Sequence, residues 1–151
     1  MSRKQDAVGR GEDVMTNYTF HRPVKRAPAA RRRFRGRVYH SLTERVRAVE
    51  LQALLESGNI VAWFPQVPVD LGLDFSTRVD FLVVGGDHVW IEEVKGFDTA
   101  EFRRIVRLWK KYGPLPMVVL WAERAGAAWR VEKIDAGRSG GTLDSDTADG
   151  D

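Results

Sequence analysis

The order of predicted elements indicates an α/β or α+β protein with a central mixed sheet flanked by helices. Two segments have apolar residues at helical spacing, and the other apolar runs are short and separated by Gly or Pro. The resulting order is helix, three strands, helix, strand, strand. Each of these elements has an apolar face to bury, so helices packed on a sheet are the expected solution.

The first helix is predicted from about residue 41 to residue 57. Ser41-Leu42-Thr43-Glu44 has the form of a capping box, and Gly58 is a typical stop signal. Glu44 shares a face with Ala48 and Leu51. Two interpretations of Glu44 therefore stay open: it returns a hydrogen bond to Ser41, or it points inward as a ligand or supporting group of a site.

Strand follows over residues 60–64 and 67–71, bent at Pro65-Gln66 or Pro68. Gln66 is either a loop residue or a polar group turned toward a site. Residues 78–84 and 88–95 form a hairpin around Gly85-Gly86-Asp87.

The second helix is predicted from about Thr99 to Tyr112, and the last two strands over residues 117–122 and 127–134. Arg103 and Arg107 lie four residues apart on that helix. They are placed to contact phosphates, although a solvated helix face explains them equally well. The tryptophans all fall inside predicted elements and are expected to pack rather than to stack on bases: Trp63, Trp90, Trp109, Trp121 and Trp129.

The hairpin brings two acids and a lysine to one face. Side chains alternate along a strand, so Glu93 and Lys95 point the same way and Glu92 points the other way. A Gly86-Asp87 turn places Asp80 opposite Glu93, whereas a Gly85-Gly86 turn places it opposite Ile91. Both registers put Asp80 on the face of Glu93 and Lys95.

Such a patch suits hydrolysis of a phosphodiester bond. Carboxylates prefer hard cations, so Asp80 and Glu93 are predicted to bind Mg²⁺, for which Mn²⁺ can substitute. The backbone carbonyl of Val94 is placed to join them, and Lys95 can hold the attacking water or stabilise charge on the phosphate. Burial would lower the pKa of Lys95 and the two acids would raise it, an alternative that the sequence leaves open.

Charge is distributed unevenly along the chain. Residues 1–37 carry 11 Lys or Arg against three acids, and residues 135–151 carry one Arg against five Asp. We expect a basic, unstructured arm over residues 1–35, one domain over 36–135 and an acidic, unstructured tail over 136–151. The basic arm indicates a polyanionic partner such as DNA, although a solvated tail without a partner is the alternative. Its candidate DNA contacts are Arg31, Arg32, Arg33, Arg35 and Arg37.

Composition narrows the class of protein further. The chain has no cysteine, so disulfides and thiolate metal sites are excluded. The sequence has no apolar run of the roughly 20 residues that span a bilayer, and its start does not have the pattern of a secretory signal. We therefore expect a cytoplasmic protein without a membrane partner.

These motifs resemble the PD-(D/E)xK nuclease superfamily, whose core has the order αβββαβ and a restriction-endonuclease-like fold. From Gly36 to about Leu120 the chain further resembles small phage-encoded nucleases related to Holliday-junction resolvases. Val79 replaces the formal proline, and His40 stands where an acid is expected. We interpret His40 as a polar residue before a helix cap and not as a ligand. The matching segments are Tyr39-His40-Ser41-Leu42-Thr43-Glu44, Pro65-Gln66, Val79-Asp80-Phe81 and Glu93-Val94-Lys95-Gly96.

The resemblance implies a Mg²⁺-dependent endodeoxyribonuclease in which Asp80 and Glu93 bind metal, Lys95 assists catalysis and Glu44 contributes from the helix. Its expected substrate is branched DNA, as in recombination, in a cell that a phage infects. Resolution of a four-way junction needs two symmetric cuts, which predicts a homodimer. The alternatives are a nuclease subunit that cuts flaps, single strands or transposition ends, and a DNA-binding module without activity.

Overall fold

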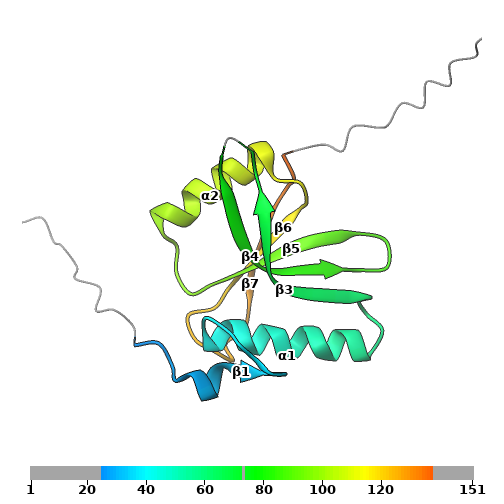
Figure 1. Cartoon of the computed structure of the whole chain (residues 1–151), viewed down its shortest axis with the longest axis vertical. Coiled ribbons are helices and arrows are strands. Elements are labelled where there is room, and N and C mark those ends of the chain that lie inside the picture. Colours follow the sequence, from blue (N-terminus) through cyan, green and yellow to red (C-terminus); the bar gives the residue numbers. More distant parts are fainter. Residues whose placement is uncertain (1–24, 73, 138–151) are drawn as a thin grey trace, which may run out of the picture.

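A five-stranded sheet lies between two α-helices in the computed structural model, which describes residues 25–72 and 74–137 (Figure 1). Strands β5 and β6 pair in parallel, and the other neighbours in the sheet pair antiparallel. The predicted fold class, a mixed sheet flanked by helices, is therefore confirmed. The strand order is β3 (Ala62–Asp70), β4 (Ser76–Val84), β5 (Val89–Lys95), β6 (Met117–Trp121) and β7 (Arg130–Ile134).

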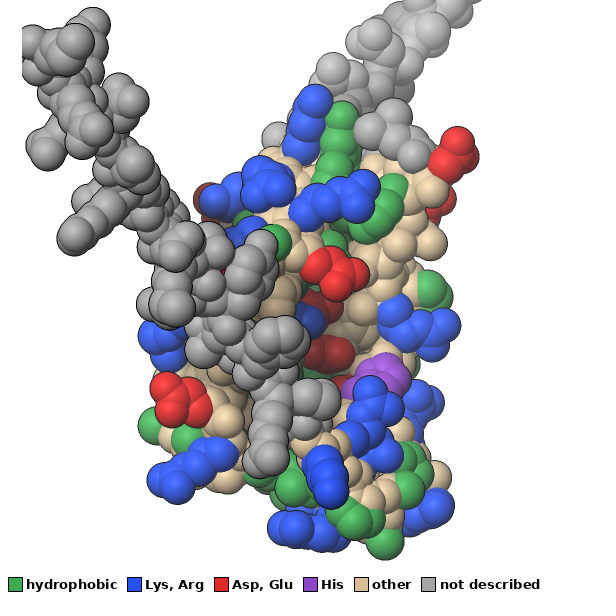
Figure 2. Space-filling view, turned by 90° about the vertical axis from the view of Figure 1, so that its left-hand side faces the viewer, with side chains coloured by type: hydrophobic (Ala, Val, Ile, Leu, Met, Phe, Trp, Pro, Cys, Tyr) green, Lys and Arg blue, Asp and Glu red, His purple; other side chains and the backbone are tan. Residues whose placement is uncertain are grey.

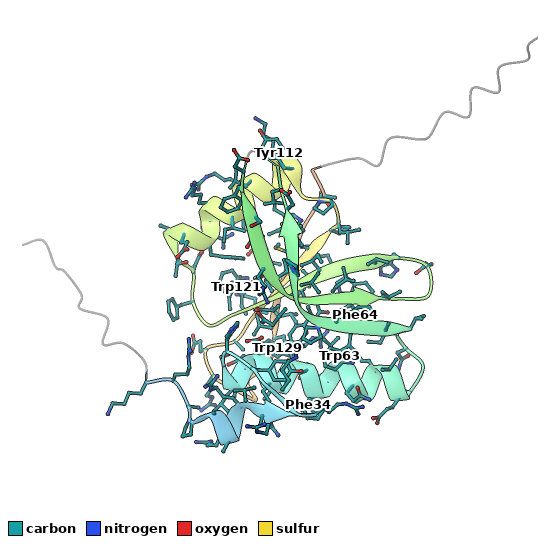
Figure 3. The ribbon with its side chains drawn as sticks, in the orientation of Figure 1. Phe34, Trp63, Phe64, Tyr112, Trp121 and Trp129 are labelled. Carbon is teal, nitrogen blue, oxygen red and sulfur yellow. The ribbon has the colours of Figure 1, made fainter. Side chains whose placement is uncertain are left out.

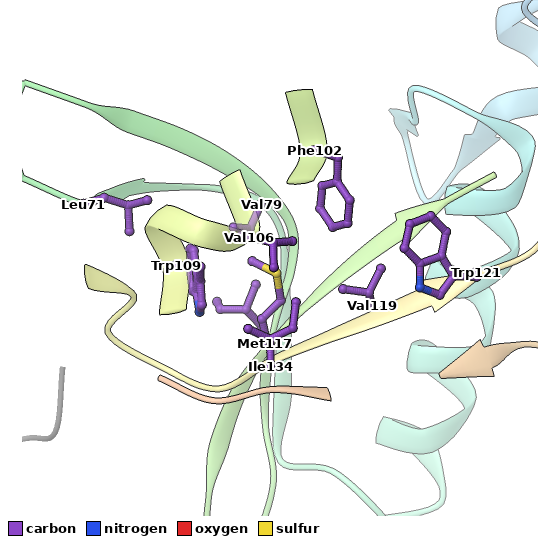
Figure 4. Packing of buried hydrophobic residues seen from close by; sticks show 10 residues of the cluster. Leu71, Val79, Phe102, Val106, Trp109, Met117, Val119, Trp121 and Ile134 are labelled. Carbon is purple, nitrogen blue, oxygen red and sulfur yellow. The ribbon is translucent and has the colours of Figure 1, made fainter. Parts of the chain in front are cut away.

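Helix α1 (Leu42–Glu56) covers one face of the sheet, and helix α2 (Ala100–Tyr112) covers the other. Phe81 and Val83 of β4 pack with the α1 side, whereas Ile91 of β5 packs with the α2 side. On β5 side chains alternate between the two cores, whereas β4 sends Val79 to the α2 core and Phe81 and Val83 to the α1 core. Figure 4 shows the α2 core, in which Trp109 is fully buried.

Both helices begin at the residues that the sequence predicts. The Ser41 hydroxyl accepts a hydrogen bond from the Glu44 N–H at 3.0 Å, and the Thr99 hydroxyl accepts one from the Phe102 N–H at 3.1 Å. A side-chain cap stabilises a helix by about 1 kcal/mol because it satisfies an N–H that lacks a helical partner. The Ser41 cap fixes where the helix begins and thereby helps to position Glu44, three residues further on.

The β4–β5 hairpin has the first of the two registers that we considered. Gly85 N–H donates to the His88 carbonyl at 2.8 Å, so Gly86-Asp87 is the two-residue turn. Phe81 consequently pairs with Glu92.

Two predicted strands differ from the observed ones. Strand β3 runs from Ala62 to Asp70 as one strand, but it departs from regular geometry at the predicted bend, where Gln66 has a φ of 56° and is missing from the register with β4. Strand β7 begins at Arg130 and not at residue 127, so Trp129 lies in the preceding loop.

Part of the predicted unstructured arm has regular structure. A 3-10 helix (η1, Ala29–Arg32) leads into a short hairpin of β1 (Arg33–Phe34) and β2 (Arg37–Val38). Arg35 and Gly36 form its turn with φ of 48° and 78°, the left-handed conformation that tight hairpin turns use. Phe34 packs against the α1 core, which explains why this segment orders although its sequence has no periodicity. The first 24 residues of the arm and the tail from residue 138 lie outside the described residues.

Neither described α-helix has the length and apolarity that crossing a bilayer requires.

Candidate active site

Asp80 lies where β4 separates from β5. The paired register ends at Phe81 and Glu92, and one step further places Asp80 opposite Glu93. Asp80 Oδ2 accepts a hydrogen bond from the Val94 N–H at 2.8 Å. This bond holds the carboxylate against β5 at the point where the backbone ladder stops. The Val94 N–H, and not its carbonyl, makes this contact, so the carbonyl as a metal ligand stays a prediction.

Gln66 joins Asp80 to Glu44. It lies in β3, so the loop interpretation is wrong, and its side chain is turned to the site. Its Nε2 donates to Glu44 Oε1 at 2.5 Å and lies 3.3 Å from Asp80 Oδ1. Gln66 has a φ of 56°, within a strand whose neighbours Pro65 and Val67 pair regularly with β4. A left-handed residue that is not glycine costs about 1–2 kcal/mol. Here that conformation accompanies the amide bridge between the two acids.

Glu44 combines the two interpretations that the sequence left open. Its Oε2 accepts a hydrogen bond from the His40 N–H at 3.0 Å, one residue before the Ser41 partner of a standard capping box. Its Oε1 faces Gln66 in the site. Glu44 is only 3% exposed, so this carboxylate has exchanged water for these two donors.

Glu93 and Lys95 share one face, as the alternation predicts. Lys95 Nζ lies 2.8 Å from Glu93 Oε2 and 4.9 Å from the ring centre of Phe102 on α2. Glu92 points to the opposite face, where it contacts Arg47 of α1. The structure therefore places Glu93, not Glu92, beside Asp80.

Burial raises the pKa of all three acids, and the charge of Asp80 adds to this effect for Glu44 and Glu93. Burial first, and then the charge of Asp80, raise the pKa of Glu44 from 4.5 to about 7. The same two causes raise the pKa of Glu93 to about 7, although Lys95 opposes them. Burial raises the pKa of Asp80 as well, again against Lys95. Without an added positive charge, these carboxyl groups do not all ionise easily near neutral pH.

The same charges act in the opposite direction on the lysine. Burial lowers the pKa of Lys95, but Glu93 and Asp80 outweigh it, and the net pKa is raised. This result resolves the alternative that the sequence left open. Lys95 carries its proton at neutral pH, so in this structure it is a cation and a hydrogen-bond donor rather than a base.

The donor atoms suit a divalent cation. One ligand atom each from His40, Glu44 and Asp80 lies within 4.8 Å of the other two. Carboxylate oxygens suit Mg²⁺ and Mn²⁺, and an imidazole nitrogen suits transition metals. Glu93 lies outside this trio, with one oxygen on Lys95. From the sequence we did not interpret His40 as a ligand, so it is the residue of this trio that sequence reasoning missed. Its signal in the sequence was its place directly before the cap of the helix that carries Glu44.

Lys95 connects the site to a cleft at the carboxyl ends of β5 and β6, and none of the three acids lines that cleft. The cleft has a volume of about 560 Å³, and Lys95, Phe97 and Thr99 are among the residues that line it. Phe97 is 71% exposed and also lines a second cleft of about 560 Å³ beside Trp121. Figure 2 shows acidic side chains in a hollow, with Lys and Arg side chains above and below it. A polyanion can therefore contact positive charge on both sides of the acids.

The predicted DNA-contacting arginines are not equivalent. Arg31, Arg33, Arg35 and Arg37 are exposed. Arg32 instead donates to the backbone carbonyls of Ala27 and Tyr39, so it holds the N-terminal segment together.

On α2 the two predicted arginines also differ. Arg103 pairs with Asp98 at 2.6 Å and with Glu132 at 2.9 Å, whereas Arg107 is exposed. The charge of Arg103 is therefore already partnered, which makes Arg107 the stronger candidate for a phosphate contact.

A partly buried polar network that the sequence did not reveal lies behind the site. Arg47 donates to both oxygens of Glu92 at 2.7 Å and to Glu50 at 2.8 Å. The indole N–H of Trp90 donates to Glu92 at 3.0 Å, and that of Trp129 donates to Glu50 at 2.9 Å. Figure 3 shows Trp129 beside α1. The network fixes α1, which carries Glu44, against β5, which carries Glu93.

No protein-family model matches the chain, and comparisons with curated proteins and with solved structures gave no match either.

Proposed function

We propose that this protein is a metal-dependent endodeoxyribonuclease that hydrolyses phosphodiester bonds. The observation that carries the proposal is the meeting of Glu44, Asp80, Glu93 and Lys95, from α1, β4 and β5, at the point where β4 leaves β5. A structural ion pair does not need three buried carboxylates, two of which have their pKa raised by the charge of the third, Asp80. A site that binds a cation does.

Asp80 and Glu44 would hold Mg²⁺ or Mn²⁺, with Glu93 turning from Lys95 to join them. When bound, the ion would neutralise charge on the phosphate and activate water. Lys95 keeps its proton and can donate a hydrogen bond to a phosphate oxygen. Gln66 holds Glu44 and Asp80 in place through its amide.

The surrounding charge favours a nuclease over an inert DNA-binding module. A module that only bound DNA would gain nothing from buried carboxylates at the centre of a basic surface, because they repel phosphate. With a cation present, the same carboxylates attract the phosphate through the ion. The basic rim then adds affinity that does not depend on sequence.

Within this activity we propose branched DNA as the substrate and a homodimer as the active form, from the resemblance to resolvase-related nucleases. Paired cuts across a junction require two sites related by symmetry. Flaps, single strands and transposition ends are the alternative substrates.

The test is cleavage of a labelled four-way junction beside linear duplex, flap and single-stranded DNA, with Mg²⁺, Mn²⁺ or EDTA. We expect cutting that needs metal, and a decrease of about 100-fold or more in rate for Asp80→Asn and Lys95→Ala. Asp87→Asn and Lys111→Ala are matched controls at exposed positions away from the acids and should cut normally. Cutting of all four DNAs in EDTA, or normal cutting by Asp80→Asn, would contradict the proposal.

A further inference from the structure

His40 lies beside Glu44 and Asp80, and its ring is exposed. Its side chain is 64% exposed, and its Nδ1 lies 3.8 Å from Glu44 Oε2. Its backbone N–H, not its ring, makes the hydrogen bond to Glu44. Any residue with a backbone N–H could make that bond, so helix capping gives no reason for an imidazole here.

The distances allow the ring to share one ion with Glu44 and Asp80. Two ligands on opposite sides of an ion of the size of Mg²⁺ lie about 4.2 Å apart, twice the usual bond of about 2.1 Å. The three donor atoms already lie within 4.8 Å of one another. Because His40 is exposed, its ring can close the difference by rotation, while Gln66 keeps both acids in place.

We propose that His40 is a ligand of this metal site and shifts its preference from Mg²⁺ toward transition-metal ions such as Mn²⁺ and Co²⁺. An all-oxygen site suits Mg²⁺, whereas an added imidazole raises affinity in the order Mn²⁺, then Co²⁺. The inference rests on the proposed function, since it concerns the ion that the nuclease would use. It adds which residue selects that ion.

The experiment is titration of Mg²⁺, Mn²⁺ and Co²⁺ into the whole protein without DNA, followed by calorimetry and, for Co²⁺, by visible absorption. The pH is held mildly alkaline, where an ordinary imidazole is neutral. The variants are His40→Ala and His40→Asp. His88→Ala and His21→Ala are controls at the chain's other two histidines, and the His88 side chain is 66% exposed, close to that of His40.

We expect the affinity of His40→Ala for Mn²⁺ and Co²⁺ to fall at least about tenfold. A loss of about this size is usual even for residues that only hydrogen-bond to a metal ligand, so loss of a ligand itself should cost no less. Its affinity for Mg²⁺ should change much less. His40→Asp should bind Mg²⁺ as well as or better than the wild type but should not regain the Co²⁺ spectrum. Both control histidine variants should bind all three ions normally.

Wild-type binding of all three ions by His40→Ala would overturn the inference. Asp80→Asn separates that failure from failure of the proposed function. If Asp80→Asn abolishes binding that His40→Ala leaves intact, the metal site stands and only the role of His40 fails. If the wild-type protein binds none of the ions, both proposals fail.

Discussion

Each acid in the candidate site has a partner, yet the group as a whole repels itself. Glu44 accepts from Gln66 and His40, Asp80 accepts from Val94, and Glu93 pairs with Lys95. One lysine cannot balance three carboxylates, and the pKa values of Glu44 and Glu93 rise to about 7 as a result of burial and of Asp80. The fold tolerates this repulsion, and function would explain why.

The sign of the resulting pH dependence follows from the raised pKa. A carboxyl group that titrates at 4.5 when unfolded and at about 7 when folded binds more protons in the folded state between these values. Its contribution to stability is therefore largest below pH 4.5, falls as the pH rises toward 7, and stays low above that.

Asp80→Asn should accordingly stabilise the metal-free protein at pH 8 by about 1 kcal/mol or more, since one pKa unit corresponds to about 1.4 kcal/mol. The gain should shrink at pH 5, where Glu44 and Glu93 are protonated in the folded protein. Urea unfolding in EDTA at both pH values measures this gain in stability. Asp87→Asn, at an exposed position, is the control. An Asp80→Asn protein that is less stable than the wild type at pH 8 would show that the acids do not strain the fold.

At the scale of elements, β5 and α1 each carry residues of the site and residues of the polar network behind it. On β5 the adjacent residues Glu93 and Glu92 point to opposite faces, toward Lys95 and toward Arg47. On α1, Glu44 and Arg47 are three residues apart, about one helical turn. The ion pair of Arg47 with Glu92 therefore sets the spacing between the strand and the helix that supply the candidate ligands.

Arg47→Ala should destabilise the protein by about 3 kcal/mol or more, because it leaves Glu92, which is 2% exposed, buried without its cation. A double variant, Arg47→Met with Glu92→Leu, should recover part of this stability because no unpaired charge remains. Urea unfolding measures both. Arg45→Ala on the same helix is the control, and among the described residues its guanidinium makes one long contact, 3.4 Å to the Arg33 carbonyl. If Arg47→Ala lowered the free energy of unfolding no more than Arg45→Ala does, the network would not hold α1 on the sheet.

At the scale of the whole molecule, much of the N-terminal positive charge lies on residues 25–37, which the structure describes. Residues 1–24 carry four Lys or Arg against three acids, whereas residues 25–37 carry seven and no acid. The latter segment includes η1, β1 and β2: η1 and β1 contact α1, and β2 packs against both of them. Its exposed arginines thus have fixed positions relative to the site.

Replacing Arg31, Arg33, Arg35 and Arg37 with Gln should weaken DNA binding and flatten its dependence on salt. The slope of log K against log salt should become shallower by about 0.9 for each phosphate that the protein no longer neutralises. Fluorescence anisotropy with a labelled duplex, in EDTA and over a series of salt concentrations, measures this slope. Removal of residues 1–24, which carry little net charge, is the comparison and should change the slope much less. If the truncation has the larger effect, the four replaced arginines are not the residues that bind the DNA.

The sequence by itself determined both helices, the cap of the first, the hairpin and the face shared by Asp80, Glu93 and Lys95. These follow from local rules: helical spacing, capping hydroxyls, and the alternation of side chains along a strand. The N-terminal hairpin could not be predicted, because its order comes from Phe34 packing on a distant core.

Only the tertiary structure decided the rest of the site. Gln66 reaches Glu44 and Asp80 because β3 lies beside β4, and His40 joins Glu44 and Asp80 because the start of α1 lies over the place where β4 leaves β5. The pKa values likewise depend on burial and on charges from three elements. Periodicity describes one element at a time, whereas a metal site is a set of distances between elements.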